Sequence, residues 1–79
     1  MEYKEFRNVY CRVAYYKSRG FRIYRPEQPH LLLEVKELML VWGSVKEAHL
    51  DRWNNRTDQW VLNVNYQNGS NECFIIARG

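Results

Sequence analysis

The stretch WVLNVNYQNGSNECFIIA, residues 60–77, decides the fold. From Trp60 to Tyr66, bulky apolar residues alternate with mostly polar ones, which is the period-2 pattern of a half-buried strand. Asn68-Gly69 is the favoured pair for a two-residue type I′ turn, in which both residues need φ > 0. Cys73–Ala77 returns as a second apolar run. The pattern predicts an antiparallel β-hairpin that turns at Asn68-Gly69.

A two-residue turn also predicts the register of this hairpin, because side chains alternate strictly between the two faces of a strand. The face expected to be buried carries three opposed pairs: Leu62 with Ile75, Val64 with Cys73, and Trp60 with Ala77. Asn63 and Asn65 then lie on the opposite, wetter face.

The N-terminal third fits two structures. Residues 9–16 alternate and are rich in β-formers, so with Phe21–Arg25 across a turn they predict a second hairpin. A helix over residues 2–19 competes, since Glu2 and Glu5 would lie in its first turn and Gly20 would follow its end. The β-branched and aromatic side chains favour the hairpin, and the helix stays the alternative.

Between these segments the spacing predicts two helices. Pro29 suits a first helical position, and apolar residues at helical spacing continue to Gly43, so a helix is expected over about residues 29–42. Ser44-Val45-Lys46-Glu47 has the pattern of a capping box, in which a hydroxyl and a carboxylate satisfy free amides. It predicts a second helix over about residues 45–54.

Length and composition indicate one small domain spanning residues 1–79, since domains usually hold about 50 to 200 residues. Twelve residues are Trp, Tyr or Phe, a large number for so thin a core. These rings either bury large areas or lie on a surface that meets a partner. The expected fold is α+β: one antiparallel sheet from the N-terminal and the C-terminal β-hairpin, with one or two helices (about 29–42 and 45–54) packed on one face.

Charge is unevenly distributed along the chain. Residues 1–25 carry seven basic and two acidic side chains, a net charge of +5, whereas residues 26–79 carry five basic and seven acidic ones, a net charge of −2. No apolar run approaches the roughly 20 residues of a membrane helix, and the N-terminus lacks the layout of a signal peptide. We therefore expect a cytoplasmic protein without membrane contact.

Residue types that form active sites are present but scattered. His30, His49, Cys11 and Cys73 lack the close spacing of a zinc site, and the glycines are isolated, so no metal or other cofactor is expected. Both cysteines fall on apolar faces of predicted strands, where a thiol is usually buried and inert. A domain this small also has difficulty enclosing a catalytic pocket. The sequence therefore favours a protein that is not an enzyme.

Basic and aromatic residues are interleaved in the N-terminal third, and Tyr, Trp and Arg are the residue types that dominate protein interfaces. The expected function is that of a small non-enzymatic binding protein that engages or inhibits a larger, acidic protein partner. The predicted partner-binding residues are Arg12, Tyr16, Lys17, Arg19, Arg22, Tyr24 and Arg25. The apolar surplus also allows a homodimer.

Two alternatives use the same residues. Guanidinium groups that meet phosphates and rings that stack on unpaired bases would form a regulatory module for single-stranded RNA or DNA. Alternatively, the tyrosines pack on the core and the arginines only keep a surface solvated. The sequence does not decide whether Trp53 is a core residue or an exposed anchor.

Overall fold

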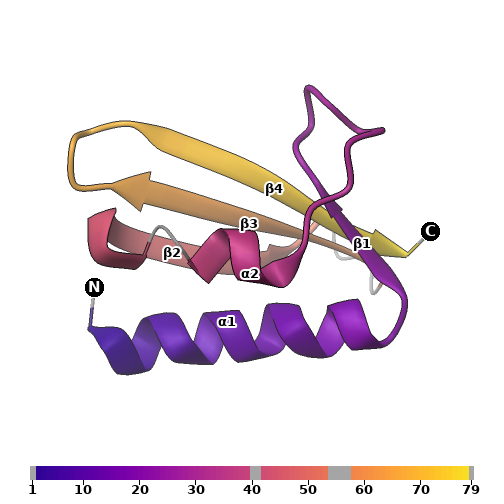
Figure 1. Ribbon diagram of the computed structural model, residues 1–79, viewed down its shortest axis with the longest axis horizontal. Coiled ribbons are helices and arrows are strands. Elements are labelled where there is room, and N and C mark those ends of the chain that lie inside the picture. The colour runs from indigo at the N-terminus through magenta and orange to yellow at the C-terminus, as the bar shows by residue number, and fades with distance from the viewer. Residues whose placement is uncertain (1, 40–41, 54–57, 79) are drawn as a thin grey trace.

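The computed structural model describes residues 2–39, 42–53 and 58–78. Its elements in chain order are α1 (Tyr3–Ser18), β1 (Phe21–Tyr24), α2 (Val35–Met39), the 3-10 helix η1 (Trp42–Ser44), β2 (Val45–Arg52), β3 (Gln59–Tyr66) and β4 (Asn71–Arg78). The four strands form one antiparallel sheet in the order β1-β4-β3-β2, with α1 and α2 packed against it (Figure 1). The predicted α+β class is confirmed. No helix in the described part of the chain is long and apolar enough to cross a membrane.

The hydrophobic core lies between α1 and one face of the sheet. Phe6 and Val13 are seven residues apart on α1, so two helical turns place them on the same, buried side. Ile23 of β1 is paired with Ile76 of β4, and both side chains are 0% exposed. Leu38 of α2 is buried in the same cluster. Val61 and Ile75, a cross-strand pair on the opposite face of the sheet, are also buried but do not belong to this cluster.

The N-terminal hairpin predicted from the sequence is wrong, and the alternative helix is right. α1 has Glu5 in its first turn and Lys17 in its last. Gly20 follows it with a φ of +93°, which glycine adopts without steric penalty. The aromatic and β-branched residues recur at helical spacing and pack on the core, namely Phe6, Val9, Tyr10, Val13 and Tyr16. Of the predicted hairpin only Phe21–Tyr24 is a strand, and it pairs with β4.

The helix predicted over residues 45–54 is also wrong, because Val45–Arg52 form β2, an edge strand of the sheet. A β-bulge between Val45 and Glu47 shifts the alternation of buried and exposed side chains. The period-2 signal is broken at the same place where Ser44 and Glu47 match a capping box. Residue 54 lies outside the described residues. The helix predicted over residues 29–42 is shorter than expected, since α2 covers only Val35–Met39 and residues 40–41 lie outside the described residues.

The C-terminal hairpin is confirmed, but its register differs by one residue from the prediction. Leu62 lies opposite Phe74, and Trp60 lies opposite Ile76. The Tyr66 N–H donates to the Ser70 carbonyl at 2.9 Å, and the Gly69 N–H donates to the Tyr66 carbonyl at 3.0 Å. The loop therefore holds three residues and ends at Gly69, whose φ of +89° is left-handed.

This register decides which side chains reach the core. Phe74 and Ile76 are core residues, whereas Cys73 and Ile75 lie on the opposite face of the sheet. The predicted pairs of Leu62 with Ile75, Val64 with Cys73 and Trp60 with Ala77 are therefore wrong. The turn contains one residue more than a type I′ hairpin, and that residue moves every side chain of β4 to the other face.

Candidate binding site

The structure divides the seven predicted binding residues among three places. Four lie at the C-terminal half of α1 or at its C-cap, two lie on the sheet face opposite α1, and one follows β1: these are Arg12, Tyr16, Lys17 and the C-cap residue Arg19, then Arg22 and Tyr24, then Arg25. A hairpin would have brought them to one surface. Because residues 3–18 form a helix instead, Arg22 and Tyr24 face away from the arginines of α1.

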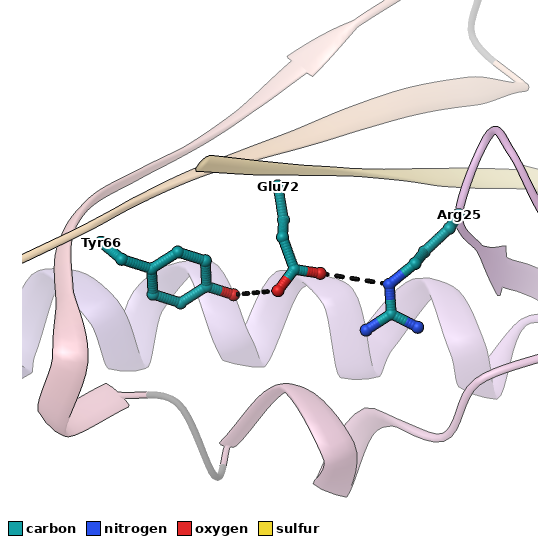
Figure 2. Close-up of polar contacts among 3 residues, drawn as sticks. All are labelled: Arg25, Tyr66 and Glu72. Atoms are coloured by element: carbon teal, nitrogen blue, oxygen red, sulfur yellow. Dashed lines mark hydrogen bonds and ion pairs between the residues drawn. The ribbon is translucent and has the colours of Figure 1, made fainter. Parts of the chain in front are cut away.

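Arg25 has an internal partner. Its Nε donates to Glu72 Oε2 at 3.1 Å, and the Tyr66 hydroxyl donates to Glu72 Oε1 at 2.9 Å (Figure 2). The Arg25 guanidinium also lies 5.3 Å from the centroid of the Phe74 ring. These side chains come from β3, from β4 and from the residue after β1, so they clamp three parts of the sheet together. We therefore leave Arg25 out of the candidate site.

The clamp is a satisfied polar network on the edge of the core. Burial, followed by the hydrogen bond to Glu72, raises the pKa of Tyr66 to about 12. The phenol therefore stays protonated at neutral pH and donates to the carboxylate. Half-buried polar groups stabilise a fold only when their partners are in place, which is the case for all three side chains here.

A different group of arginines gathers at one end of the molecule, where α1 and β4 end and β1 begins (Figure 1). Each guanidinium lies over an aromatic ring. Arg12 and Arg52 are 5.1 and 5.5 Å from the ring of Trp60, Arg19 is 5.2 Å from that of Tyr15, and Arg78 is 5.6 Å from that of Phe21. We call these four arginines and their rings the arginine end.

The rings of the arginine end form one contiguous cluster centred on Tyr16. Its centroid lies 5.1 Å from that of Phe21, 5.1 Å from that of Trp60 and 5.6 Å from that of Tyr15. Offset and tilted arrangements at such distances are favourable. Tyr16 thus has a supporting role, because it holds together the rings on which the arginines lie.

None of the four guanidinium groups forms a salt bridge with any residue in the described ranges. The two salt bridges found there, Arg25 with Glu72 and His49 with Glu47, lie outside the arginine end. All four arginine side chains are exposed. A cation over a ring face keeps its N–H edge free to donate to an oxyanion. The arginine end is therefore a positively charged surface whose guanidiniums form no salt bridge within residues 2–39, 42–53 and 58–78.

Two exposed rings accompany these arginines. Tyr15 is 53% exposed, and Trp53, which follows Arg52 directly, is 46% exposed. The backbone N–H of Trp53 donates to the Gln59 carbonyl at 3.1 Å, which keeps the Trp53 backbone beside the start of β3. Trp60 differs, since it is buried and its Nε1 has no hydrogen-bond partner among the residues that the structure describes.

Sequence reasoning found only part of this site. Arg12, Tyr16 and Arg19 were predicted, and their helical spacing would also have pointed to Tyr15. Arg52, Trp60 and Arg78 were missed because nothing local marks them. Only the pairing of β3 with β2 and with β4 brings these residues to one end of the sheet.

Two hollows lie away from the arginine end, and both are polar. One of about 270 Å³ is lined by Glu27, Asn63, Val64, Asn65, Asn71, Glu72 and Cys73. The other, of about 300 Å³, is lined by Glu2, Glu5, Lys46, Glu47, Ala48 and His49. Within the described ranges, no three His, Cys, Asp or Glu side chains are placed to hold a metal ion.

The two cysteines do not lie where the sequence predicted. Cys11 is exposed on α1, and Cys73 is half-buried on the face of β4 that points away from the core. Both had been expected on buried strand faces. Burial, and then the nearby Glu27 carboxylate, raises the pKa of the Cys73 thiol, which lowers its reactivity.

Comparison of the chain with protein-family models, with curated proteins and with solved structures found no match. The arginine end is therefore interpreted from its own geometry and charge.

Proposed function

We propose that the chain is a small non-enzymatic binding protein of the cytoplasm that engages a larger, acidic protein partner through the arginine end. The observation that carries this proposal is a group of four exposed guanidiniums that have no carboxylate partner in the part of the chain that the structure describes, namely Arg12, Arg19, Arg52 and Arg78. Complementary charge on a partner accelerates association and selects against wrong partners.

Pre-organisation supports a role in binding. An arginine that is free in solution loses about 0.5–1.5 kcal/mol of side-chain freedom when an interface immobilises it. Stacking on Trp60, Tyr15 and Phe21 restricts these side chains before a partner arrives. The exposed rings of Tyr15 and Trp53 add apolar contact area beside the charges. Arg, Tyr and Trp are the residue types most often found at interface hot spots.

Most aromatic ring faces of the arginine end are already covered by other side chains, which favours a protein partner over a single-stranded nucleic acid. Bases bind by stacking on aromatic faces that are free. The Trp60 ring, however, already has Arg12, Arg52 and Tyr16 around it, and Arg19 lies over Tyr15. What remains available is the N–H edges of the guanidiniums, which pair well with carboxylates and with phosphates, and the exposed ring of Trp53. One free ring is less than the series of stacking faces that a single-stranded nucleic acid uses.

The test compares two variants with the same net charge. In the first, Arg12, Arg19, Arg52 and Arg78 are all changed to Gln. The matched control changes Lys4, Arg7, Lys36 and Lys46 to Gln, which are exposed basic residues outside the arginine end. Wild type and both variants are used for affinity purification from the native host, and the affinity for the purified partner is then measured by calorimetry.

We expect the partner to be recovered with wild type and with the control, and to bind the first variant at least about tenfold more weakly, a difference of 1.4 kcal/mol. An equal loss in both variants would show that only net charge matters, which contradicts a defined site. Recovery of RNA or DNA in place of a protein, with affinity that falls steeply as salt rises, would replace this proposal with the nucleic-acid alternative.

A further inference from the structure

The segment that follows β1 is a loop built from two consecutive turns. The Gln28 N–H donates to the Arg25 carbonyl at 2.9 Å, and the Leu31 N–H donates to the Gln28 carbonyl at 3.1 Å. Pro26 and Pro29 each occupy the second position of a turn, where their fixed φ suits the geometry. We call residues 25–32 the proline loop. It occupies part of the range in which the sequence predicted a helix.

Both ends of the proline loop are fixed to the sheet. At its start, Arg25 is held by Glu72 and Tyr66 (Figure 2). At its end, the Leu33 N–H donates to the Ile23 carbonyl at 2.8 Å, and the Leu33 side chain is buried in the core. Between these points the loop projects beyond the sheet, on the side away from α1 (Figure 1). The loop is thus a pre-formed projection.

Two neighbouring apolar side chains on this projection are left in solvent. Leu31 is 49% exposed and Leu32 is 48% exposed, whereas Leu33 next to them is 5% exposed. Of these three leucines, Leu33 is therefore the one that anchors the segment in the core. Adjacent exposed leucines on a rigid projection are an unfavourable surface for a chain in water, and they suit insertion into an apolar pocket of another molecule.

The charged residues near Leu31 and Leu32 in the sequence indicate which kind of surface would bind the two leucines: a membrane, a second copy of the chain or another protein. Residues 26–35 contain Glu27 and Glu34 and no Lys or Arg. Of the two basic residues that flank this range, Arg25 is paired with Glu72, and Lys36 lies on α2. An anionic bilayer attracts basic segments, so these carboxylates disfavour it. The two hollows described on the chain are lined mainly by carboxylates and amides, so a second copy offers neither of them as an apolar pocket. A protein pocket with Lys or Arg at its rim fits both the leucines and the carboxylates.

We propose that the proline loop is a second docking element, whose Leu31 and Leu32 enter an apolar pocket of a partner protein that is rimmed by basic side chains. This contact goes beyond the proposed function of the arginine end, because it needs a partner surface of the opposite charge. Since the turns and the clamp hold the loop in place, little ordering is required when the partner binds.

The first step of the test is site-specific photo-cross-linking with the full chain in its native host. A benzoylphenylalanine replaces Leu32 in one version and Gln67, an exposed polar residue of the C-terminal hairpin loop, in the control version. We expect a covalent adduct with one protein from position 32 and not from position 67. A version that carries the four Arg→Gln changes of the arginine end and the photoreactive group at position 32 should still give this adduct. The two proposals therefore fail separately.

The second step measures the affinity of the purified adduct partner for designed variants. L31S/L32S should bind at least tenfold more weakly with an unchanged melting temperature, since both side chains are already about half exposed. E27Q/E34Q keeps the leucines and should weaken binding severalfold. P26A/P29A should also weaken it, because the turns are then less restricted.

Several outcomes would overturn the proposal: no adduct from position 32, an adduct only with a second copy of the chain, or an affinity unchanged by L31S/L32S. Co-sedimentation of wild type with phosphatidylcholine and phosphatidylserine vesicles, lost in L31S/L32S, would identify a lipid surface and would equally overturn it.

Discussion

Tyr66 links the stability of the protein to pH at the scale of one hydroxyl group. Its pKa is about 12 in the folded chain, against an ordinary value of 10.0, because burial and the hydrogen bond to Glu72 disfavour the phenolate. An acid whose pKa is raised by folding contributes stability that is fully present below its unfolded pKa and is lost as pH rises through its folded pKa. We therefore expect the free energy of unfolding to fall between about pH 10 and pH 12.

Tyr66→Phe tests this link. Removal of the hydroxyl donor should cost about 1 kcal/mol at pH 7, a typical net value for one hydrogen bond. It should also make the decline above pH 10 shallower than in wild type, as measured by urea unfolding at a series of pH values. Tyr15→Phe is the control, since Tyr15 is exposed. If Y66F declines as steeply as Y15F, Tyr66 does not carry the effect.

Gly69 and Gly20 are the residues whose backbone conformation only glycine adopts freely. Their φ values are +89° and +93°, and a Cβ at either position would meet no atom within 4 Å. The cost of substitution is therefore conformational and not steric. We expect G69A and G20A each to lose about 1–2 kcal/mol of stability. Gly43→Ala, in a position without positive φ and equally open, is the matched control and should change stability little.

At the scale of whole elements, the success of sequence reasoning depended on how local each signal was. The C-terminal hairpin was predicted because alternation and Asn68-Gly69 lie within one short stretch. Its register was missed because a two-residue turn and a three-residue turn ending in glycine share that dipeptide. The strand β2 was missed because its bulge is set by pairing with β3, which leaves no mark in residues 45–52.

For the helix α1, a local signal was present but indicated the wrong structure. β-branched and aromatic residues from 9 to 16 have strand propensity, but tertiary packing overrode it. Their spacing places Tyr10, Val13 and Tyr16 on one side of a helix, next to the core. The same helix explains why half of the candidate site was found, since Arg12 lies on α1 and Arg19 is its C-cap residue, while Arg52 and Arg78 lie on strands of the sheet.

The N-terminus of α1 offers a direct test of this element. Its N-cap residue, Glu2, makes no side-chain hydrogen bond to the first turn. Glu5 lies three residues later, so Glu2→Ser creates a complete capping box. We expect E2S to stabilise the protein by about 0.5–1 kcal/mol. The measurement is the urea midpoint at unchanged m-value. Glu2→Ala is the control, and an equal gain in E2A would show that removal of the charge, and not capping, is responsible.

At the scale of the whole molecule, positive charge is gathered at the arginine end. The sequence has twelve basic and nine acidic side chains, and neither salt bridge among the described residues involves Arg12, Arg19, Arg52 or Arg78. Arg12 and Arg52 share the ring of Trp60, so two like charges are held near each other by packing. We therefore expect the folded state to keep repulsion that the unfolded chain relieves, and the proposed acidic partner would relieve it as well.

Salt should therefore stabilise this protein. The longest dimension of the molecule is 31 Å. The Debye length is about 30 Å at 0.01 M salt and about 8 Å at 0.15 M, so added salt removes most of the repulsion among the arginines. We expect the melting temperature to rise by a few degrees over this range, which for a domain of this size corresponds to about 1 kcal/mol or less.

The four-arginine variant separates this effect from general screening. With Arg12, Arg19, Arg52 and Arg78 changed to Gln, the rise in melting temperature with salt should largely disappear, whatever the absolute value at low salt. The control with Lys4, Arg7, Lys36 and Lys46 changed to Gln should keep it, because these residues lie outside the arginine end and its four guanidiniums are left in place. A melting temperature of wild type that falls as salt is added would mean that attractive pairs such as Arg25 with Glu72 outweigh the repulsion. In that case repulsion among the four arginines would not destabilise the folded chain, and an acidic partner would have no repulsion to relieve. The main argument for the proposed binding function would then be lost.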